Sequence, residues 1–360
     1  MGRRLLRSLG TILAASVLVL ASSAAAERVH VGYPNAIVVL GHSGATGYNS
    51  DPQRPGADVL ANSWATGSNP EVRSLYLRIL EANPAIRGHN ANLARDGATI
   101  HDLLSQSASA VGLRPKPQLV VIQILDNDIR CDGTDSSNYG RFRASFITAL
   151  SILSRGLPNA RIYVVSQPGR PATYAEAIKD IPEARAEFTG DGPCDLFDTA
   201  GDIVPAHVAY LTSVIEQYEA RLKSGCARFV HCRWDGGALS RYVDDLAGLS
   251  PVDWGHLSVE GHTRVAEYAW SGIFDFTDTA APVSKASVSR GRRSRVVTLS
   301  ATDEAGVAGV EYKVVPRKRR QATIAYRRYG APVRVKRGST LVWRAVDVNG
   351  NTEATHSLRG

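Results

Sequence analysis

The residues best suited to chemistry are a serine and a histidine that lie far apart in the chain. Ser43 directly follows the apolar run 36–40, and a serine on a tight turn there would point its hydroxyl into a cleft. His256 follows Asp253 by three residues, so the carboxylate can orient the imidazole while the other ring nitrogen takes a serine proton. Such a set would perform nucleophilic acyl transfer. Taken alone, Ser43 is explained about as well as an ordinary turn serine.

A second segment, residues 92–99, runs from a strand-like stretch into a helix-like one. Gly97 allows the backbone to approach a ligand closely, and its N–H near a helix start can donate to an anion. The alternative is a plain helix entry in which Asp96 or Thr99 is the capping residue.

A third segment places Asn127 between Asp126 and Asp128, directly after a buried strand. An asparagine amide is a suitable donor to a developing oxyanion. Two acids at the end of a strand are costly to bury without partners, so coordination of a metal by Asp126 and Asp128 is the competing interpretation.

These segments need a scaffold that brings strand ends together. Short apolar, β-rich runs alternate with amphipathic stretches, which predicts a three-layer α/β domain with a parallel sheet. In this architecture ligands bind beyond the carboxyl ends of the strands. We expect strands within 36–40, 89–94, 118–125 and 161–166, and helices within 72–80, 100–104, 142–153, 206–222 and 259–270.

In combination the segments resemble the SGNH/GDSL hydrolase superfamily, over most of residues 34 to 275. The family carries Ser, Gly, Asn and Asp-x-x-His in four successive blocks, in the order seen here. The resemblance implies a flavodoxin-like sheet, no metal and no organic cofactor. It implies catalysis by Ser43, His256 and Asp253, with an oxyanion hole formed by the Ser43 and Gly97 N–H groups and the Asn127 side chain.

Two positions depart from the family pattern. His42 stands where the first block usually has Asp, and Leu125 stands where the third block usually has Gly. Neither change removes a proposed proton carrier or oxyanion donor. The stretches 48–66 and 169–193 are long enough to shape a pocket, and we expect further pocket residues among His42, Arg95, Asp96, Asp126, Asp128 and Arg130.

Residues 1–26 have the pattern of a signal peptide, with a basic start, a short apolar run and a small-residue cleavage site. An uncleaved membrane anchor is the alternative, but the apolar run is too short to span a bilayer. The route of export is left open. We therefore expect a secreted protein without a transmembrane segment.

The chain has four cysteines, an even number that predicts two disulfides in an exported protein. We favour Cys131–Cys194 and Cys226–Cys232 among the three possible pairings. Zinc is the competing interpretation, but the sequence has no CxxC pair.

The chain divides by charge. Residues 285–359 carry 17 Lys/Arg against 5 Asp/Glu, a net charge of +12 in a chain whose total is +8. We expect a catalytic domain at 27–276, a linker at 277–283 and a small basic β-sandwich at 284–360. Strand-like runs at 296–300, 310–314, 331–335 and 341–346 support the sandwich, which looks like the Ig-like modules of secreted bacterial enzymes.

The basic runs 317–320 and 327–328 could bind an anionic cell-surface polymer, although a solvated loop that only raises solubility is the favoured explanation. Nucleic acid is excluded as a partner by the predicted export and by the lack of a recognisable binding module. We expect a monomer.

These observations lead to the hypothesis of a secreted serine esterase acting on a lipid, acyl or acetylated-carbohydrate ester. Two rivals have different chemistry. One is a metal-dependent hydrolase using Asp126, Asp128 and a histidine; the other is a non-enzymatic wall-binding protein whose basic domain is the working part.

Overall fold

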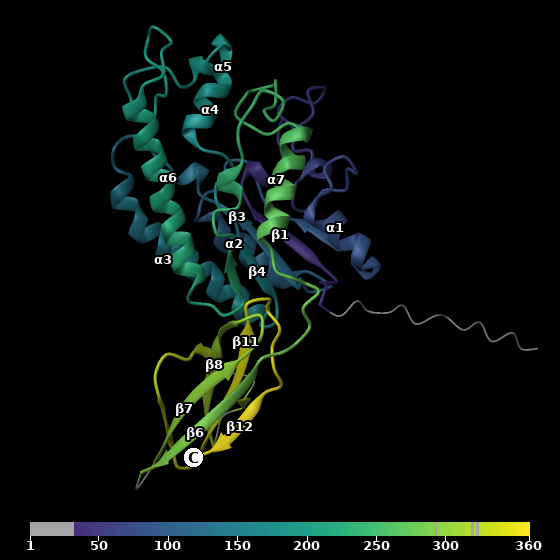
Figure 1. The fold of residues 1–360 in the computed structure, drawn as a ribbon, viewed down its shortest axis with the longest axis vertical. Coiled ribbons are helices and arrows are strands. Elements are labelled where there is room, and N and C mark those ends of the chain that lie inside the picture. Colours follow the sequence, from purple (N-terminus) through teal and green to yellow (C-terminus); the bar gives the residue numbers. More distant parts are fainter. Residues whose placement is uncertain (1–31, 292–293, 318–319, 322–323) are drawn as a thin grey trace, which may run out of the picture.

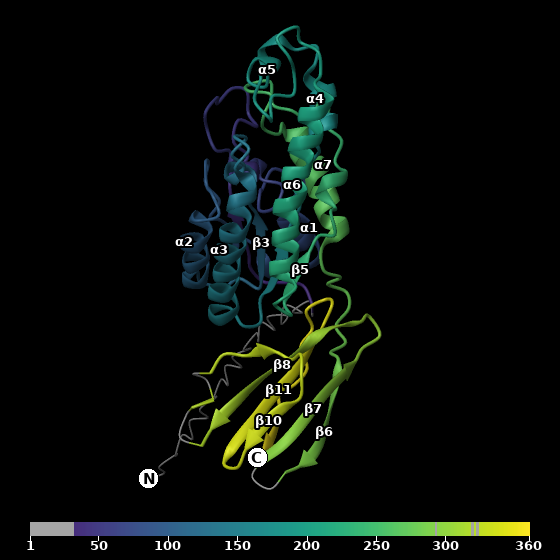
Figure 2. The same cartoon turned by 90° about the vertical axis from the view of Figure 1, so that its left-hand side faces the viewer.

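The computed structural model describes residues 32–291, 294–317, 320–321 and 324–360, which form an α/β body and a β module (Figures 1 and 2). The predicted signal peptide lies outside the described residues. The module lies against one end of the body, and both parts are drawn out along one long axis (Figure 2).

The body is built on a five-stranded parallel sheet in the order β2-β1-β3-β4-β5. This is the flavodoxin-like order, so the fold predicted from the sequence is confirmed. The fifth strand was missed because it is three residues long and only partly buried. The strands are β1 (Ile37–Gly41), β2 (Asn90–Asn92), β3 (Leu119–Gln123), β4 (Arg161–Val164) and β5 (Cys232–Trp234).

Helices cover both faces of this sheet. Alternate residues of β1 point to opposite faces: Ile37 and Val39 pack with α1 (Leu75–Ala82) and α7 (Val259–Gly272). Val38 and Leu40 pack on the other side with α2 (Asp102–Gly112), α3 (Asp135–Gly156) and α6 (Pro205–Cys226). Because both faces are covered, the central strands β1 and β3 are nearly continuous apolar runs rather than alternating ones.

Two shorter helices lie beyond the carboxyl ends of the strands, at the end of the body away from the module (Figure 1). These are α4 (Pro171–Ile178) and α5 (Pro182–Ala186), and they pack with part of α6 in a small apolar cluster of their own. We call residues 171–215 the cap. No helix within the described ranges is both long and apolar enough to cross a membrane.

Both disulfides have the pairing favoured from the sequence. Cys131 joins Cys194, which ties the cap to the loop after β3. Cys226 joins Cys232 across six residues, which ties the end of α6 to β5.

The module consists of two antiparallel sheets, with strand orders β10-β7-β6 and β12-β11-β8-β9, that share one apolar core. The predicted runs correspond to β7, β8, β10 and β11, whereas β6, β9 and β12 carry little apolar pattern and were not predicted. The strands are β6 (Val283–Arg290), β7 (Ser294–Thr302), β8 (Val307–Pro316), β9 (Arg327–Arg328), β10 (Val333–Lys336), β11 (Ser339–Asp347) and β12 (His356–Arg359).

A buried arginine holds the module against the body. Arg344 on β11 pairs with Glu311 on β8 at 2.5 Å, and its other nitrogens donate to Asn159 Oδ1 and Pro158 O, at 2.9 and 3.0 Å. Pro158 and Asn159 precede β4, so the module sits at the amino ends of the body's strands. The connection between α7 and β6, which includes the linker proposed for 277–283, packs Phe276 into the body core.

We predict that Arg344→Ala destabilises the protein by about 3 kcal/mol, because buried Glu311 would lose its permanent cation and keep the weaker contact with His231 Nε2 at 3.7 Å. Thermal unfolding monitored by circular dichroism checks this. Arg334→Ala, an exposed arginine on β10, is the matched control and should stay within about 0.5 kcal/mol. Equal effects of the two substitutions would show that the junction is not held in this way.

Candidate active site

The serine lies on a short turn, and the backbone of Gly41, which leads into this turn, is tightly constrained. Gly41, the last residue of β1, has φ of +140°, and a side chain there would collide with Gln123 O. The amide of Gln106 on α2 brackets the same residue, accepting from Gly41 N–H at 2.7 Å and donating to Gly41 O at 2.9 Å. The chain then enters a 3₁₀ turn at Ser43–Ala45, where Ser43 is 7 % exposed.

The histidine from the other end of the body meets this serine. His256 Nε2 lies 2.9 Å from Ser43 Oγ, and His256 Nδ1 lies 2.7 Å from Asp253 Oδ2. The other oxygen of Asp253 accepts from the N–H groups of Gly255 and His256, which closes the turn before α7. Imidazole is thus held between a carboxylate and a hydroxyl, the arrangement needed to accept the hydroxyl proton.

Asn49 and Tyr48 support this arrangement; both lie in the stretch 48–66 that was expected to shape a pocket, but neither was singled out by itself. Asn49 donates to Asp253 Oδ2 at 2.5 Å, and Tyr48 stands edge-on to the His256 ring at 4.8 Å between centroids. Burial alone would raise the pKa of Asp253, but hydrogen bonds from His256 and Asn49 outweigh it and bring that pKa below its usual value. Asp253 therefore stays ionised next to the imidazole. Beyond that stretch, the available signal was only that Asn49 follows Ser43 closely.

Gly97 and Asn127 lie on two neighbouring turns that are hydrogen-bonded to each other. Asn127 Nδ2 donates to Ala98 O at 3.0 Å, and Asp128 accepts from Ile100 N–H at 2.8 Å. Gly97 has φ of +68°, which favours glycine. Burial raises the pKa of Asp128 to about 7, and its contact with Ile100 makes it a support for these turns.

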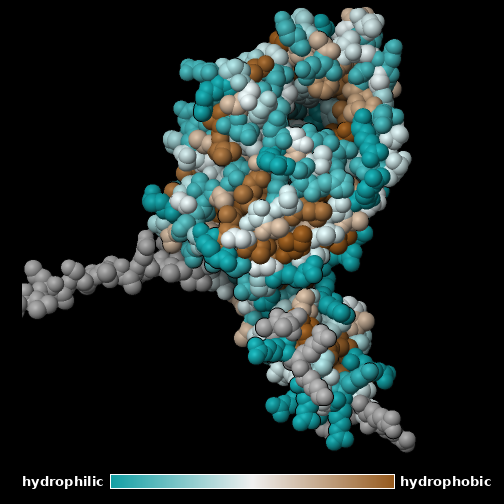
Figure 3. Space-filling view, turned by 180° about the vertical axis from the view of Figure 1, so that it is seen from behind, coloured by the Kyte–Doolittle hydropathy of each residue, from teal (hydrophilic) through white to brown (hydrophobic). Residues whose placement is uncertain are grey.

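A cavity of about 370 Å³ opens at Ser43 and His256. The body is hollowed at the end away from the module, as Figure 3 shows from behind. Its size is in the range of small-molecule sites. Much of its wall is apolar and comes from the cap and the loops beside it: Ile129, Pro171, Tyr174, Phe188, Leu196, Leu211, Ile215, Leu249 and Leu257.

The six residues expected to add to the pocket have different positions. Asp126 is the one of them that lines the cavity in the described part of the chain. Arg95 pairs instead with Asp102 at the start of α2, and Arg130 contacts Thr134. The remaining three are also outside the cavity wall: Asp96 is exposed, Asp128 holds the Ile100 turn, and His42 is buried behind the serine.

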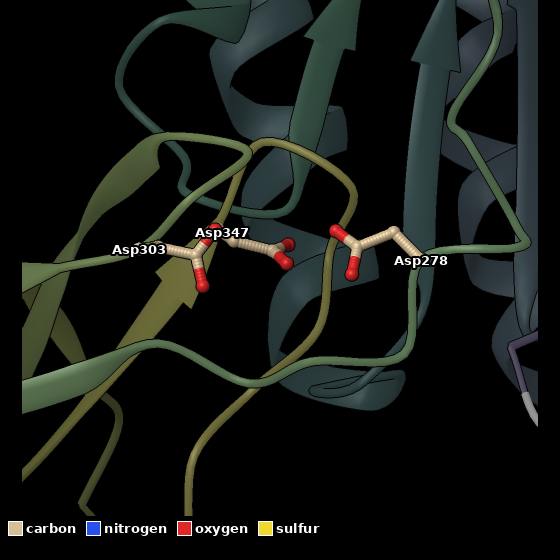
Figure 4. Close-up of side chains that lie close together, drawn as sticks. All are labelled: Asp278, Asp303 and Asp347. Atoms are coloured by element: carbon tan, nitrogen blue, oxygen red, sulfur yellow. The ribbon is translucent and has the colours of Figure 1, made fainter.

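In the described part of the chain, Asp126 and Asp128 do not belong to a group of three side chains close enough to share an ion, because Asp128 turns to Ile100 N–H. Within residues that the structure describes, one group of three acidic, histidine or cysteine side chains is close enough to share an ion. It consists of Asp278, Asp303 and Asp347, whose carboxylate oxygens lie within 4.8 Å of one another (Figure 4). This group lies at the junction with the module, where Asp347 accepts hydrogen bonds from the 349–351 turn.

Several solved structures are similar to this chain at low identity. The psychrotrophic esterase EstA from Pseudoalteromonas sp. is 13% identical, with a TM-score of 0.36, over 66% of this chain and 96% of its own. Phospholipase A1 from Streptomyces albidoflavus NA297 is 14% identical, with a TM-score of 0.34, over 64% and 98%. TesA is 13% identical, with a TM-score of 0.39, over 66% and 97%. No curated protein sequence matches the chain.

A family model settles the relationship that these distant structures leave open. The model of the GDSL-like Lipase/Acylhydrolase family matches residues 37–269, which is more than half of the chain. The match begins at β1, before Ser43, and ends within α7, after His256. The chain therefore belongs to the GDSL-like lipase/acylhydrolase family and is an ester hydrolase.

Proposed function

We propose that the protein hydrolyses carboxylic esters by two-step acyl transfer through Ser43. The observation that carries this is the line of contacts from Asp253 through His256 to the serine hydroxyl. His256 takes the proton as Ser43 Oγ bonds to the ester carbonyl carbon. It then protonates the departing alcohol, and water activated by the same imidazole releases the acid from the acyl-enzyme.

The oxyanion formed in each step needs donors, and the two turns beside the serine can supply them. The N–H groups of Ser43 and Gly97 and the second N–H of the Asn127 amide are the donors we propose, since Asn127 uses one N–H on Ala98. Loss of a single such donor costs other hydrolases about 2.7–4 kcal/mol in the transition state.

We expect Ser43→Ala to lower kcat on p-nitrophenyl acetate by about 10⁴-fold or more, because no other group would form the acyl-enzyme. A fluorophosphonate probe should label the parent on the peptide that contains Ser43. Ser68→Ala, at an exposed serine, is the control and should keep the parental rate. Activity that survives in Ser43→Ala, or that is lost in EDTA and restored by a metal ion, would refute the proposal in favour of the metal-dependent rival.

The cavity favours an acyl ester over an acetylated carbohydrate. Apolar side chains of the cap, including Phe188, Leu196, Leu211 and Ile215, give it a surface on which an alkyl chain loses contact with water. A sugar would bring hydroxyl groups that such a wall cannot satisfy. We infer that a short to medium acyl chain binds under the cap while the alcohol faces solvent.

Chain-length dependence tests this substrate class. For p-nitrophenyl esters we expect kcat/KM to rise by about fourfold per methylene until the cavity is full, the factor expected from burial of one methylene. Leu211→Trp should abolish that rise and leave acetate hydrolysis within about threefold, whereas Val288→Trp, an exposed position on β6, should change neither. A profile that is highest for acetate and flat beyond it would contradict an acyl site.

We also propose that the protein is secreted and that its module, which we take to be Ig-like, binds an anionic polymer. The two disulfides support an oxidising location. The three strands β6, β7 and β10 contain no acidic residue. Their outer face combines exposed serines and threonines with Lys285, Arg334 and Lys336. In Figure 3 the far end of the module is mainly hydrophilic.

We expect the protein to bind dextran sulfate and not neutral dextran, with affinity that falls as salt rises. Changing Lys285, Arg334 and Lys336 together to Ser should weaken this binding and leave ester hydrolysis unchanged, because these residues lie at the opposite end from the cavity. Binding that is equally strong to both polymers, or unchanged in the triple variant, would contradict this surface.

A further inference from the structure

His42 is a buried histidine that directly precedes the serine and has no part in the proton transfer described above. Its side chain is 2 % exposed. Nδ1 accepts a hydrogen bond from Gly44 N–H at 3.1 Å, which caps the turn that carries Ser43. The ring also packs over Gly44, where an added Cβ would lie 2.9 Å from His42 Cε1.

The contact with Gly44 determines the protonation state of the ring. A backbone N–H can only donate, so Nδ1 must present its lone pair, and a neutral imidazole then carries its proton on Nε2. Nε2 is buried and faces Asp126 Oδ2 at 3.4 Å. A doubly protonated ring would set an N–H against the Gly44 N–H and leave that turn without its acceptor.

Burial favours the neutral form of the ring, against the charges of the neighbouring carboxylates. Burial lowers the pKa of His42, and nearby His256 lowers it further, while Asp126 and Asp96 act in the opposite direction. Neutrality also helps the reaction, since a cation beside His256 would disfavour the imidazolium that forms there.

The ring lies between the two turns that carry proposed oxyanion donors. Its hydrogen bond is to the Ser43 turn, whereas Nε2 faces the Asn127 turn without one. One side of the ring contacts the turn of Ser43, and the other faces Asp126, which is adjacent to Asn127 in the chain. Both Ser43 and Asn127 are proposed donors to the same oxyanion. An ångström of misplacement between such groups can lower a rate by about 10²-fold.

We propose that His42, as a neutral imidazole whose Nδ1 accepts from Gly44 N–H, is a positioning residue that holds the Ser43 turn in the geometry the reaction needs. The proposal rests on the proposed function of Ser43. It predicts that full activity requires a hydrogen-bond acceptor at the place of Nδ1. A side chain that only fills the space of the ring should not be enough.

Three substitutions separate these requirements. In His42→Asn the amide oxygen can take the place of Nδ1 and accept from Gly44. His42→Phe keeps a ring without an acceptor, and His42→Gln keeps the amide but carries it one bond too far. His356→Asn, at an exposed histidine of the module, is the matched control.

We expect His42→Asn to keep kcat on p-nitrophenyl acetate within about fivefold, and His42→Phe to lose about 10²-fold in kcat with KM within about threefold. His42→Gln should behave like His42→Phe and replaces it in the comparison if the Phe variant does not fold, as judged by thermal unfolding. Labelling of each variant with the fluorophosphonate probe should slow in parallel with kcat.

Two results would overturn the proposal. One is parental kcat in a folded His42→Phe or His42→Gln variant; the other is an equal loss in His42→Asn. Failure of the proposed function looks different, because the parent itself would then resist labelling at Ser43 or Ser43→Ala would stay active.

Discussion

The arrangement of the site depends on one contact, the 2.9 Å distance between His256 Nε2 and Ser43 Oγ. The two residues come from opposite ends of the α/β body, one after β1 and the other before α7. A parallel sheet brings such positions together because every strand ends at the same edge. The apolar packing of α7 onto one face of the sheet therefore places an imidazole next to a hydroxyl.

Each partner of that contact is held by groups that are not part of it. Asp253 receives hydrogen bonds from Asn49 and from the turn it closes, and Gly41 is bracketed by Gln106 of α2. These supports are buried or partly buried polar contacts, which are costly to break and thus limit how far the site can deform. The cap adds an apolar wall, tied to the loop after β3 by Cys131–Cys194.

The module and the cap, whose residues line part of the cavity, lie at opposite ends of the molecule (Figure 2). Arg344 bridges the module to the segment before β4, so the module is joined to the body by specific polar contacts as well as by the chain. If the outer face of β6, β7 and β10 binds a polymer surface, the cavity faces away from that polymer. This geometry suits an enzyme that is retained at a surface while it acts on small esters around it.

The sequence by itself determined the α/β order of the body, the two-part organisation and the likeness to the GDSL hydrolases. These depend on local apolar pattern, charge and short motifs, all of which can be read along the chain. It also singled out Ser43, His256 and Asp253, whose roles stay proposals although the structure brings them into contact. Strands β5, β9 and β12 were not predicted from the sequence because they are short and weakly apolar.

Only the tertiary structure decided which side chains surround the serine. Stretches 48–66 and 169–193 were expected to shape a pocket, but no local pattern singled out Asn49, Gln106 or the apolar residues of the cap, because their contacts join segments that are distant in the chain. Arg95 and Arg130 were expected near the pocket by their position beside a motif, yet each is taken up by a nearby partner instead. Proximity in sequence places a residue on a turn, but packing and hydrogen bonding decide where its side chain points.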